Sequence, residues 1–189
     1  HRHFRRQRQM CIRDSYWDSQ ADFVERIRFR QELLQRAINL NDKFTIKLDH
    51  RMALGLGGAS VYETSMTLHH IYGIPYIPGS AVKGVARSWC IQTCHNNSED
   101  EAQKNAEFCA VFGNEEKHGK KGKRGQIIFF DAFPTEPPKV EIDIMNPHYG
   151  DYYNSKGEIP PADYLKPRPI PFLTVQETPF QFFLGFKPL

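Results

Sequence analysis

The sequence has no long apolar run and little cysteine, and each absence excludes a class of protein. No stretch approaches the roughly 20 apolar residues of a transmembrane helix, so we expect no contact with a membrane. Of its four cysteines, Cys11 lies in a stretch set aside below, which leaves Cys90, Cys94 and Cys109. An odd number of cysteines with no visible signal peptide argues against a disulfide framework. It favours a reducing, cytoplasmic setting.

Two signatures of catalytic sites are also missing. The glycine-rich run from Gly55 to Gly58 lacks both the strand-then-helix setting and the lysine of a phosphate-binding loop. The aspartates form no recognisable paired-carboxylate or two-metal set by their spacing, and we expect no cofactor or metal in the site. We assign no catalytic role to four of them: Asp49, Asp131, Asp143 and Asp151.

Net positive charge is confined to the first residues. The 25 Lys and Arg exceed the 22 Asp and Glu to give a net charge of +3. Residues 1–15 hold five arginines and one aspartate, so residues 16–189 have 20 basic and 21 acidic side chains, a net charge of −1. Because Met10–Ser15 is typical of a translated sequencing-library adapter, we treat residues 1–15 as a non-native tail. An arginine-rich arm that binds nucleic acid is the alternative.

The periodicity of the remaining chain predicts an α+β fold. Residues 16–39 have the pattern of an amphipathic helix, capped by Asp18 or Ser19. Its apolar side carries Phe23, Ile27, Leu34 and Ile38. Residues 43–50 alternate as a half-buried strand does, and we expect this strand at the centre of the sheet. We therefore divide the chain into a tail (1–15), an N-terminal helix (16–42) and one domain (43–189).

Further elements follow within that domain. Residues 101–112 predict a short helix that stops at Gly113. Residues 126–133 and 139–145 predict neighbouring antiparallel strands on either side of a proline-rich turn. Residues 171–175 and 179–188 predict two closing strands.

The most informative stretch is Gly73–Arg87, which reads GIPYIPGSAVKGVAR. Its prolines exclude a regular element, and Gly79 permits a sharp turn. Ser80 is placed to cap a helix over residues 80–94, with Lys83 and Arg87 on one face. Apolar positions recur elsewhere on this helix, at Val82, Val85, Ala86, Trp89 and Cys90. A rigid turn, free amides at a helix start and a basic face together predict a phosphate-binding site.

Two more segments offer contacts to RNA. Residues 114–125 form a dense basic patch, although a solvated mobile loop would have the same composition. The patch contains Lys117, His118, Lys120, Lys121, Lys123 and Arg124. Residues 146–153, NPHYGDYY, offer rings that stack on bases and amides that bind base edges. A packed loop whose tyrosines cover the core is the alternative.

These segments carry a resemblance to a known family. GIPYIPGSAVKGVAR resembles the signature of the RAMP superfamily of CRISPR-associated proteins. A wider set, LGLGGASVYETSMTLHHIYGIPYIPGSAVKG, FGNEE, IIFFDAFP, EIDIMNPHYGDYY and PIPFLTV, is similar to the sixth subunit of the type III-B Cmr complex. The similarity runs in order from Leu54 to Val175, and MNPHY is specific to this subunit.

The resemblance implies a ferredoxin-like, RRM-like core with an antiparallel sheet. It also implies a non-catalytic RNA-binding subunit of antiviral defence, which helps to hold the 3′ part of the guide RNA and the guide:target duplex beside other Cmr RAMP subunits. The family pattern continues into a second helix and a glycine-rich loop, so we expect the C-terminus to be truncated. The predicted RNA-binding residues are His69, His70, Gly79, Ser80, Lys83, Arg87, Lys120, Lys121, Lys123, Arg124, Asn146, His148, Tyr149 and Tyr152.

A metal-independent endoribonuclease is a second hypothesis, because some RAMP relatives cleave guide precursors. His69 or His148 would be the acid or base, with Lys83 stabilising the developing charge. Adjacent histidines in an extended segment point to opposite sides, so only one of His69 and His70 could serve.

A zinc-stabilised module is the third hypothesis. Cys90 and Cys94 lie one helical turn apart, and Cys109, His95 or His118 could complete four ligands. The spacing is not that of a standard zinc knuckle or ribbon. Buried free cysteines on two packed helices explain it equally well.

Overall fold

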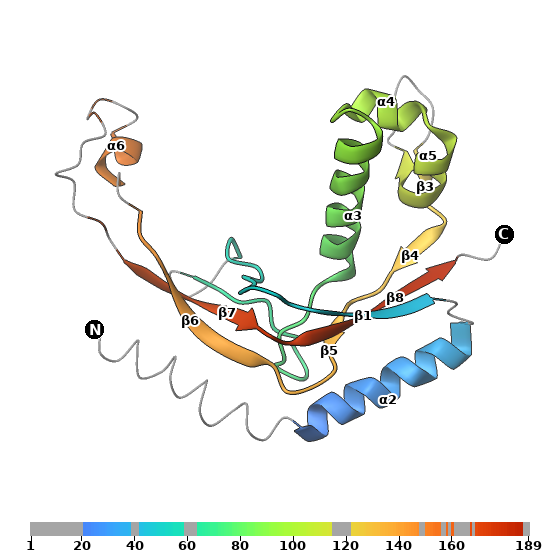
Figure 1. Cartoon of the computed structure of the whole chain (residues 1–189), viewed down its shortest axis with the longest axis horizontal. Helices are drawn as coiled ribbons and strands as arrows, with labels where there is room; N and C mark the ends of the chain where they lie inside the picture. The colour runs from blue at the N-terminus through green and yellow to red at the C-terminus, as the bar shows by residue number, and fades with distance from the viewer. Residues whose placement is uncertain are drawn as a thin grey trace. The chain divides into compact units, whose positions relative to one another are not determined.

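The computed structural model describes residues 21–38, 42–58, 64–114, 122–147, 150–155, 158, 160, 167 and 169–186. These residues form α-helices and antiparallel strands, which confirms the predicted α+β class (Figure 1). The described chain divides into two compact units. Unit 1 combines residues 48–75 with 138–178, and unit 2 combines residues 19–47, 76–137 and 179–189. The domain predicted over residues 43–189 therefore contributes to both units.

Unit 2 contains a sheet built around its last strand. β8 pairs antiparallel with β1, β4 and β5, in the order β1-β8-β4 with β5 off this path. The strands are β1 (Asp42–Lys47), β4 (Ile127–Phe129), β5 (Phe133–Pro134) and β8 (Pro179–Phe186). The prediction that the first strand is central was wrong, because β1 lies at an edge of the described sheet. Its partner strand lies more than 130 positions away along the chain, a pairing that local alternation does not encode.

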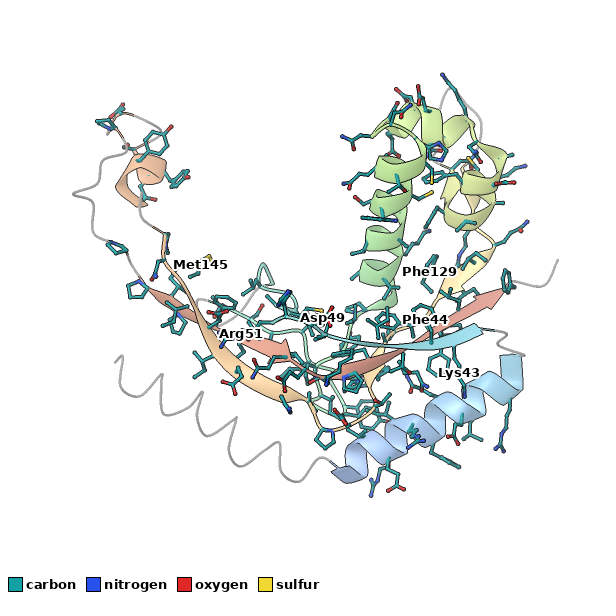
Figure 2. All side chains as sticks on the ribbon, in the orientation of Figure 1. Lys43, Phe44, Asp49, Arg51, Phe129 and Met145 are labelled. Atoms are coloured by element: carbon teal, nitrogen blue, oxygen red, sulfur yellow. The ribbon has the colours of Figure 1, made fainter. Side chains whose placement is uncertain are left out.

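An aromatic pair joins β1 and β8. Phe44 of β1, labelled in Figure 2, stacks on Phe182 of β8, and the two ring centroids lie 5.2 Å apart. Phe180 and Phe183 of β8 are buried, whereas Phe44 and Ile46 are 42% and 49% exposed. The half-buried character predicted for residues 43–50 therefore fails in β1, whose Lys43–Lys47 side chains are all exposed.

Helix α2 (Ala21–Ile38) confirms the helix predicted at residues 16–39 as far as the described residues reach. It buries Val24, Ile27 and Gln31, so the buried side chains recur every three to four residues. The candidate caps Asp18 and Ser19, and the side chains of Phe23, Leu34 and Ile38, lie outside what the structure describes.

Three helices form the second part of unit 2. Helix α3 (Gly79–Cys94) leads into α4 (Glu99–Lys104) and α5 (Ala106–Phe112), and the three lie together (Figure 1). Ile91, Ala102 and Phe108 form their buried core. The single helix predicted at residues 101–112 is two helices, because Asn105 caps a new one by accepting a hydrogen bond from the Phe108 amide at 3.0 Å. Gly113 ends α5 as predicted, with φ +88°.

The apolar side of α3 is not the buried side that its periodicity suggests. Val85 and Trp89 are 72% and 68% exposed, and Ile91 makes the buried contact instead. Helical spacing of apolar residues identified the helix correctly. It identified the face that packs only in part: among the predicted apolar positions, Cys90 packs against the buried core of the three helices.

Unit 1 is built on a long hairpin of β6 (Lys139–Met145) and β7 (Ile170–Gln176). The register pairs Val140 with Val175, and both side chains are buried. The segments predicted as neighbouring strands, 126–133 and 139–145, do not pair: β4 and β5 join β8, whereas β6 joins β7. The two predicted closing strands exist as β7 and β8, but they belong to different sheets.

A tight turn brings the first part of the GIPYIP stretch into unit 1. Leu68 forms a bridge with Pro75, and the His69 amide donates to the Ile74 carbonyl at 2.9 Å. Gly73 has φ +63°, a backbone conformation that residues with a side chain rarely adopt. Ile74, which follows it, is fully buried. A short helix, α6 (Gly150–Asn154), follows β6. No helix in the described ranges is long and apolar enough to cross a membrane.

Candidate nucleic-acid interface

Four predicted site residues gather in one open cleft of unit 2. The cleft has a volume of about 430 Å³. Its lining comes from α3, the end of α5 and the strands β2 (Gly113–Asn114) and β3 (Lys123–Arg124): Lys83, Arg87, Phe112, Gly113, Asn114, Gly122, Lys123 and Arg124. Two basic pairs, far apart in sequence, therefore face the same space.

Local geometry explains why these cations converge. Lys83 and Arg87 are four residues apart on α3, so both side chains project from the same face. β2 and β3 pair antiparallel with Gly113 opposite Arg124, and the Asn114 side chain accepts a hydrogen bond from the Lys123 amide at 2.6 Å. Only glycine fits at position 113, because its φ is positive and a Cβ there would lie 2.6 Å from the Lys123 carbonyl oxygen.

Arg87 is engaged by a carboxylate. Its guanidinium donates two hydrogen bonds to Glu99, one of them 3.0 Å long from Nη1 to Oε2. The guanidinium carbon also lies 5.4 Å from the centroid of the Phe108 ring. Across the described part of the chain, by contrast, no ion pair involves Lys83, Lys123 or Arg124.

The start of α3 differs from the prediction. Ser80 does not cap the helix: Pro78 is the N-cap residue and no side chain caps from that position. Instead Asp131, 52 residues away, accepts a hydrogen bond from the Gly79 amide at 2.7 Å. A carboxylate therefore already satisfies the amide that was expected to face a phosphate. The basic face one turn further along the helix is the more open anion site.

His69 and His70 belong to unit 1 and do not point to opposite sides. Their rings stack with centroids 4.9 Å apart, and His69 also stacks on Tyr72 at 4.8 Å. The prediction failed because the backbone turns here, with the Gly73 amide donating to the His69 carbonyl at 2.7 Å. The His69 Nδ1 accepts hydrogen bonds from the amides of Ile71 and Tyr72, at 3.3 and 3.4 Å.

The aromatic loop is described only in part. Asn146 is exposed and Tyr152 is half-buried, and both belong to unit 1. Tyr153 is 70% exposed and contacts Tyr152 edge to face, with ring centroids 5.3 Å apart. Four predicted contacts lie outside the described residues: Lys120, Lys121, His148 and Tyr149.

The cysteines do not gather as a zinc site would require. Within the described ranges, no group of three His, Cys, Asp or Glu side chains is placed to hold a metal ion. The Cys109 thiol donates to the Gln103 carbonyl at 3.2 Å. Burial, reinforced by the neighbouring Cys94, raises the pKa of the Cys90 thiol. His118 lies outside the described residues.

The neutral and acidic residues at and around the cleft were not predicted from the sequence. Phe112 and Asn114 line the cleft, Glu99 engages Arg87, and Asp131 holds the start of α3. The FGN of Phe112–Asn114 was visible only as part of a family motif. Nothing local marks Glu99 or Asp131, because each acts on a residue 12 or 52 positions away.

Comparison with known proteins places these observations in a family. A curated relative from Pyrococcus furiosus, CRISPR system Cmr subunit Cmr6, is 36% identical and aligns with 74% of this chain and 56% of its own length. The CRISPR system CMR subunit Cmr6 of Saccharolobus solfataricus is 29% identical, over 76% of this chain and 45% of its own. This chain thus spans about half the length of the curated relatives it matches.

A solved structure shares the fold. A chain of the type III-B Cmr-beta complex bound to cognate target RNA superposes with a TM-score of 0.68 at 21% identity, covering 98% of this chain and 60% of that one. This likeness agrees with the ferredoxin-like RAMP fold predicted from the sequence. The RAMP superfamily domain itself matches residues 45–181. Since that match covers most of the sequence, the chain belongs to the RAMP superfamily.

Proposed function

We propose that this protein is a non-catalytic, RNA-binding subunit of a cytoplasmic type III-B Cmr complex. In this role it helps to hold the 3′ part of the guide RNA and the guide:target duplex, beside other RAMP subunits of the complex. The target RNA and the neighbouring subunits are its further partners. The observation that carries the proposal is the basic cleft of unit 2, within a fold shared with a chain of an RNA-bound Cmr complex.

The chemistry of the cleft suits a phosphate backbone. Lys83, Lys123 and Arg124 supply positive charge from two sides, and Asn114 adds an amide. Cations that neutralise phosphates release counterions, which makes affinity depend on salt but not on sequence. Phe112 lines the same cleft, but it already contacts Phe108 and Phe129, so we give it a packing role.

The surroundings of His69 favour a non-catalytic role. Two backbone amides donate to its Nδ1, so the neutral ring carries its proton on Nε2. Neither nitrogen then offers a free lone pair for abstracting a proton from a 2′-hydroxyl. This arrangement argues against His69 as the general base of a ribonuclease, and we propose that the protein is not an enzyme.

Binding of a labelled single-stranded RNA, measured against salt concentration, tests the role of the cleft. We expect Lys83→Ala and Lys123→Ala each to weaken binding similarly for RNAs of different sequence. Each should also lower the slope of log affinity against log salt by about 0.7, the value for one phosphate contact to a single strand. Lys43→Ala, an exposed lysine on β1, is the matched control. Unchanged affinity and slope in both cleft variants would rule the cleft out.

Two further measurements test assembly and catalysis. When the complete operon is expressed, the protein should co-purify with the other Cmr subunits and a guide RNA. Failure to do so would refute the assembly role. Labelled guide precursor incubated with the protein in EDTA should remain intact. Specific cleavage that His69→Ala abolishes would establish the ribonuclease instead.

A further inference from the structure

The cleft contains a cation that is already paired within the protein. Arg87 lines the cleft, yet its guanidinium donates to both carboxylate oxygens of Glu99. Side-chain exposures of 27% for Arg87 and 47% for Glu99 leave the pair accessible to solvent and to a ligand. A two-bond guanidinium–carboxylate contact has the same geometry as a guanidinium–phosphate contact. A phosphate that binds Arg87 in this two-bond geometry would therefore compete with Glu99 for the same donors.

The Arg87 guanidinium has a second, independent support. It lies over the Phe108 ring, which is 3% exposed, at 5.4 Å from the centroid. This stacking does not depend on Glu99, so the guanidinium should stay at the cleft wall when the carboxylate is neutralised. Without the Glu99 charge, the Phe108 ring would still position the Arg87 guanidinium.

We propose that Glu99 is an internal competitor for phosphate and limits the affinity of the cleft for RNA. In the resting protein Glu99 engages Arg87, and Lys83, Lys123 and Arg124 make the first contacts. Glu99 withholds Arg87 from a short nonspecific single strand, and only a backbone that places a phosphate on Arg87 displaces Glu99 and gains the fourth cation. The ion pair thus favours RNA that places a phosphate on Arg87 over other polyanions. This inference rests on the proposed function, because it presumes that the cleft binds RNA.

The charge change makes a measurable prediction. Glu99→Gln removes the competing charge while keeping the shape of the side chain. We expect binding of a fluorescein-labelled ten-nucleotide uridine RNA to tighten about fivefold at low salt. The salt slope should become steeper by about 0.7, the amount for one additional phosphate contact.

Two matched variants separate this contact from general electrostatics. Glu101→Gln makes the same charge change two residues away on α4, at an exposed side chain, and should alter affinity less than twofold. Arg87→Gln combined with Glu99→Gln removes both charges of the pair and should return affinity and slope to wild-type values. All variants are made in the full chain, so residues 1–15 contribute equally to each. Circular dichroism checks that each variant is folded.

Each result has a distinct meaning. Tighter binding by Glu99→Gln alone, reversed in the double variant, supports the competitor role. If Lys83→Ala weakens binding but Glu99→Gln leaves it unchanged or weaker, the cleft binds RNA and the competitor role is refuted. An equal gain from Glu101→Gln also refutes it, because bulk charge then explains the effect. If neither Lys83→Ala nor Lys123→Ala affects binding, the proposed function of the cleft fails first.

Discussion

Gly79 begins α3 where the neighbouring backbone leaves no room for a side chain. A Cβ at this position would overlap the carbonyl oxygen of Phe129 and lie 3.0 Å from its carbonyl carbon. Both are backbone atoms, so neither can move aside cheaply. We expect Gly79→Ala to lower the free energy of unfolding by about 2 kcal/mol, as overpacking does, measured by urea denaturation.

Gly84 provides the control for this prediction within the same helix. A Cβ there meets nothing within 4 Å, and the position is exposed. Alanine is the better helix former, so Gly84→Ala should raise the free energy of unfolding by about 0.5 to 1 kcal/mol. Equal effects of the two substitutions would show that helix propensity, and not the contact with β4, sets the role of Gly79.

The backbone of Gly73–Arg87 could be predicted from the sequence, but the directions of the His69 and His70 side chains could not. The composition of Gly73–Arg87 correctly predicted irregular backbone followed by a basic helix. The prediction that His69 and His70 point to opposite sides was wrong. It assumed an extended backbone, whereas the chain turns here and the two rings stack. A side-chain direction depends on local dihedral angles, which a two-residue pattern does not determine.

At the scale of elements, the start of α3 depends on a carboxylate from another segment. The Gly79 amide donates to Asp131, and no side chain caps from the N-cap position. We expect Asp131→Ala to cost about 1 kcal/mol in the free energy of unfolding, the typical value for losing an N-terminal cap. Ser80→Ala should change it by less than about 0.5 kcal/mol, because the Ser80 side chain does not cap. A larger loss in Ser80→Ala than in Asp131→Ala would contradict this assignment.

The helices were easier to predict than the strand partners. Helical periodicity located α2 and α3, and Gly113 correctly ended α5. Alternation also located β6, but it gave β4 and β6 as neighbours because they are close in sequence. Pairing is decided by contacts such as Phe44 on Phe182 and Val140 opposite Val175, which join segments 35 to 138 residues apart. No local pattern carries that information.

At the scale of the whole molecule, the sequence predicted which residues belong to the candidate site but not where in the fold they meet. Lys83, Arg87, Lys123 and Arg124 were all chosen from the sequence, and the fold of unit 2 brings them to one cleft. His69, His70 and Asn146 belong to unit 1. Glu99 could not be found from the sequence, since nothing distinguishes it from its acidic neighbours Asp100 and Glu101. A basic patch can be recognised from composition, whereas the acidic residues that pair with its cations cannot.

Deletion of residues 1–15 tests whether RNA binding depends on the cleft or on overall charge. The deletion changes the net charge from +3 to −1, so it should weaken RNA binding and reduce the salt slope. The factor by which Lys83→Ala weakens binding should be the same with and without these residues, because independent contributions to binding free energy add. Fluorescence anisotropy on the four proteins measures both factors. If Lys83→Ala has no effect in either chain while the deletion abolishes binding, the arginine-rich segment, and not the cleft, is the element that binds RNA.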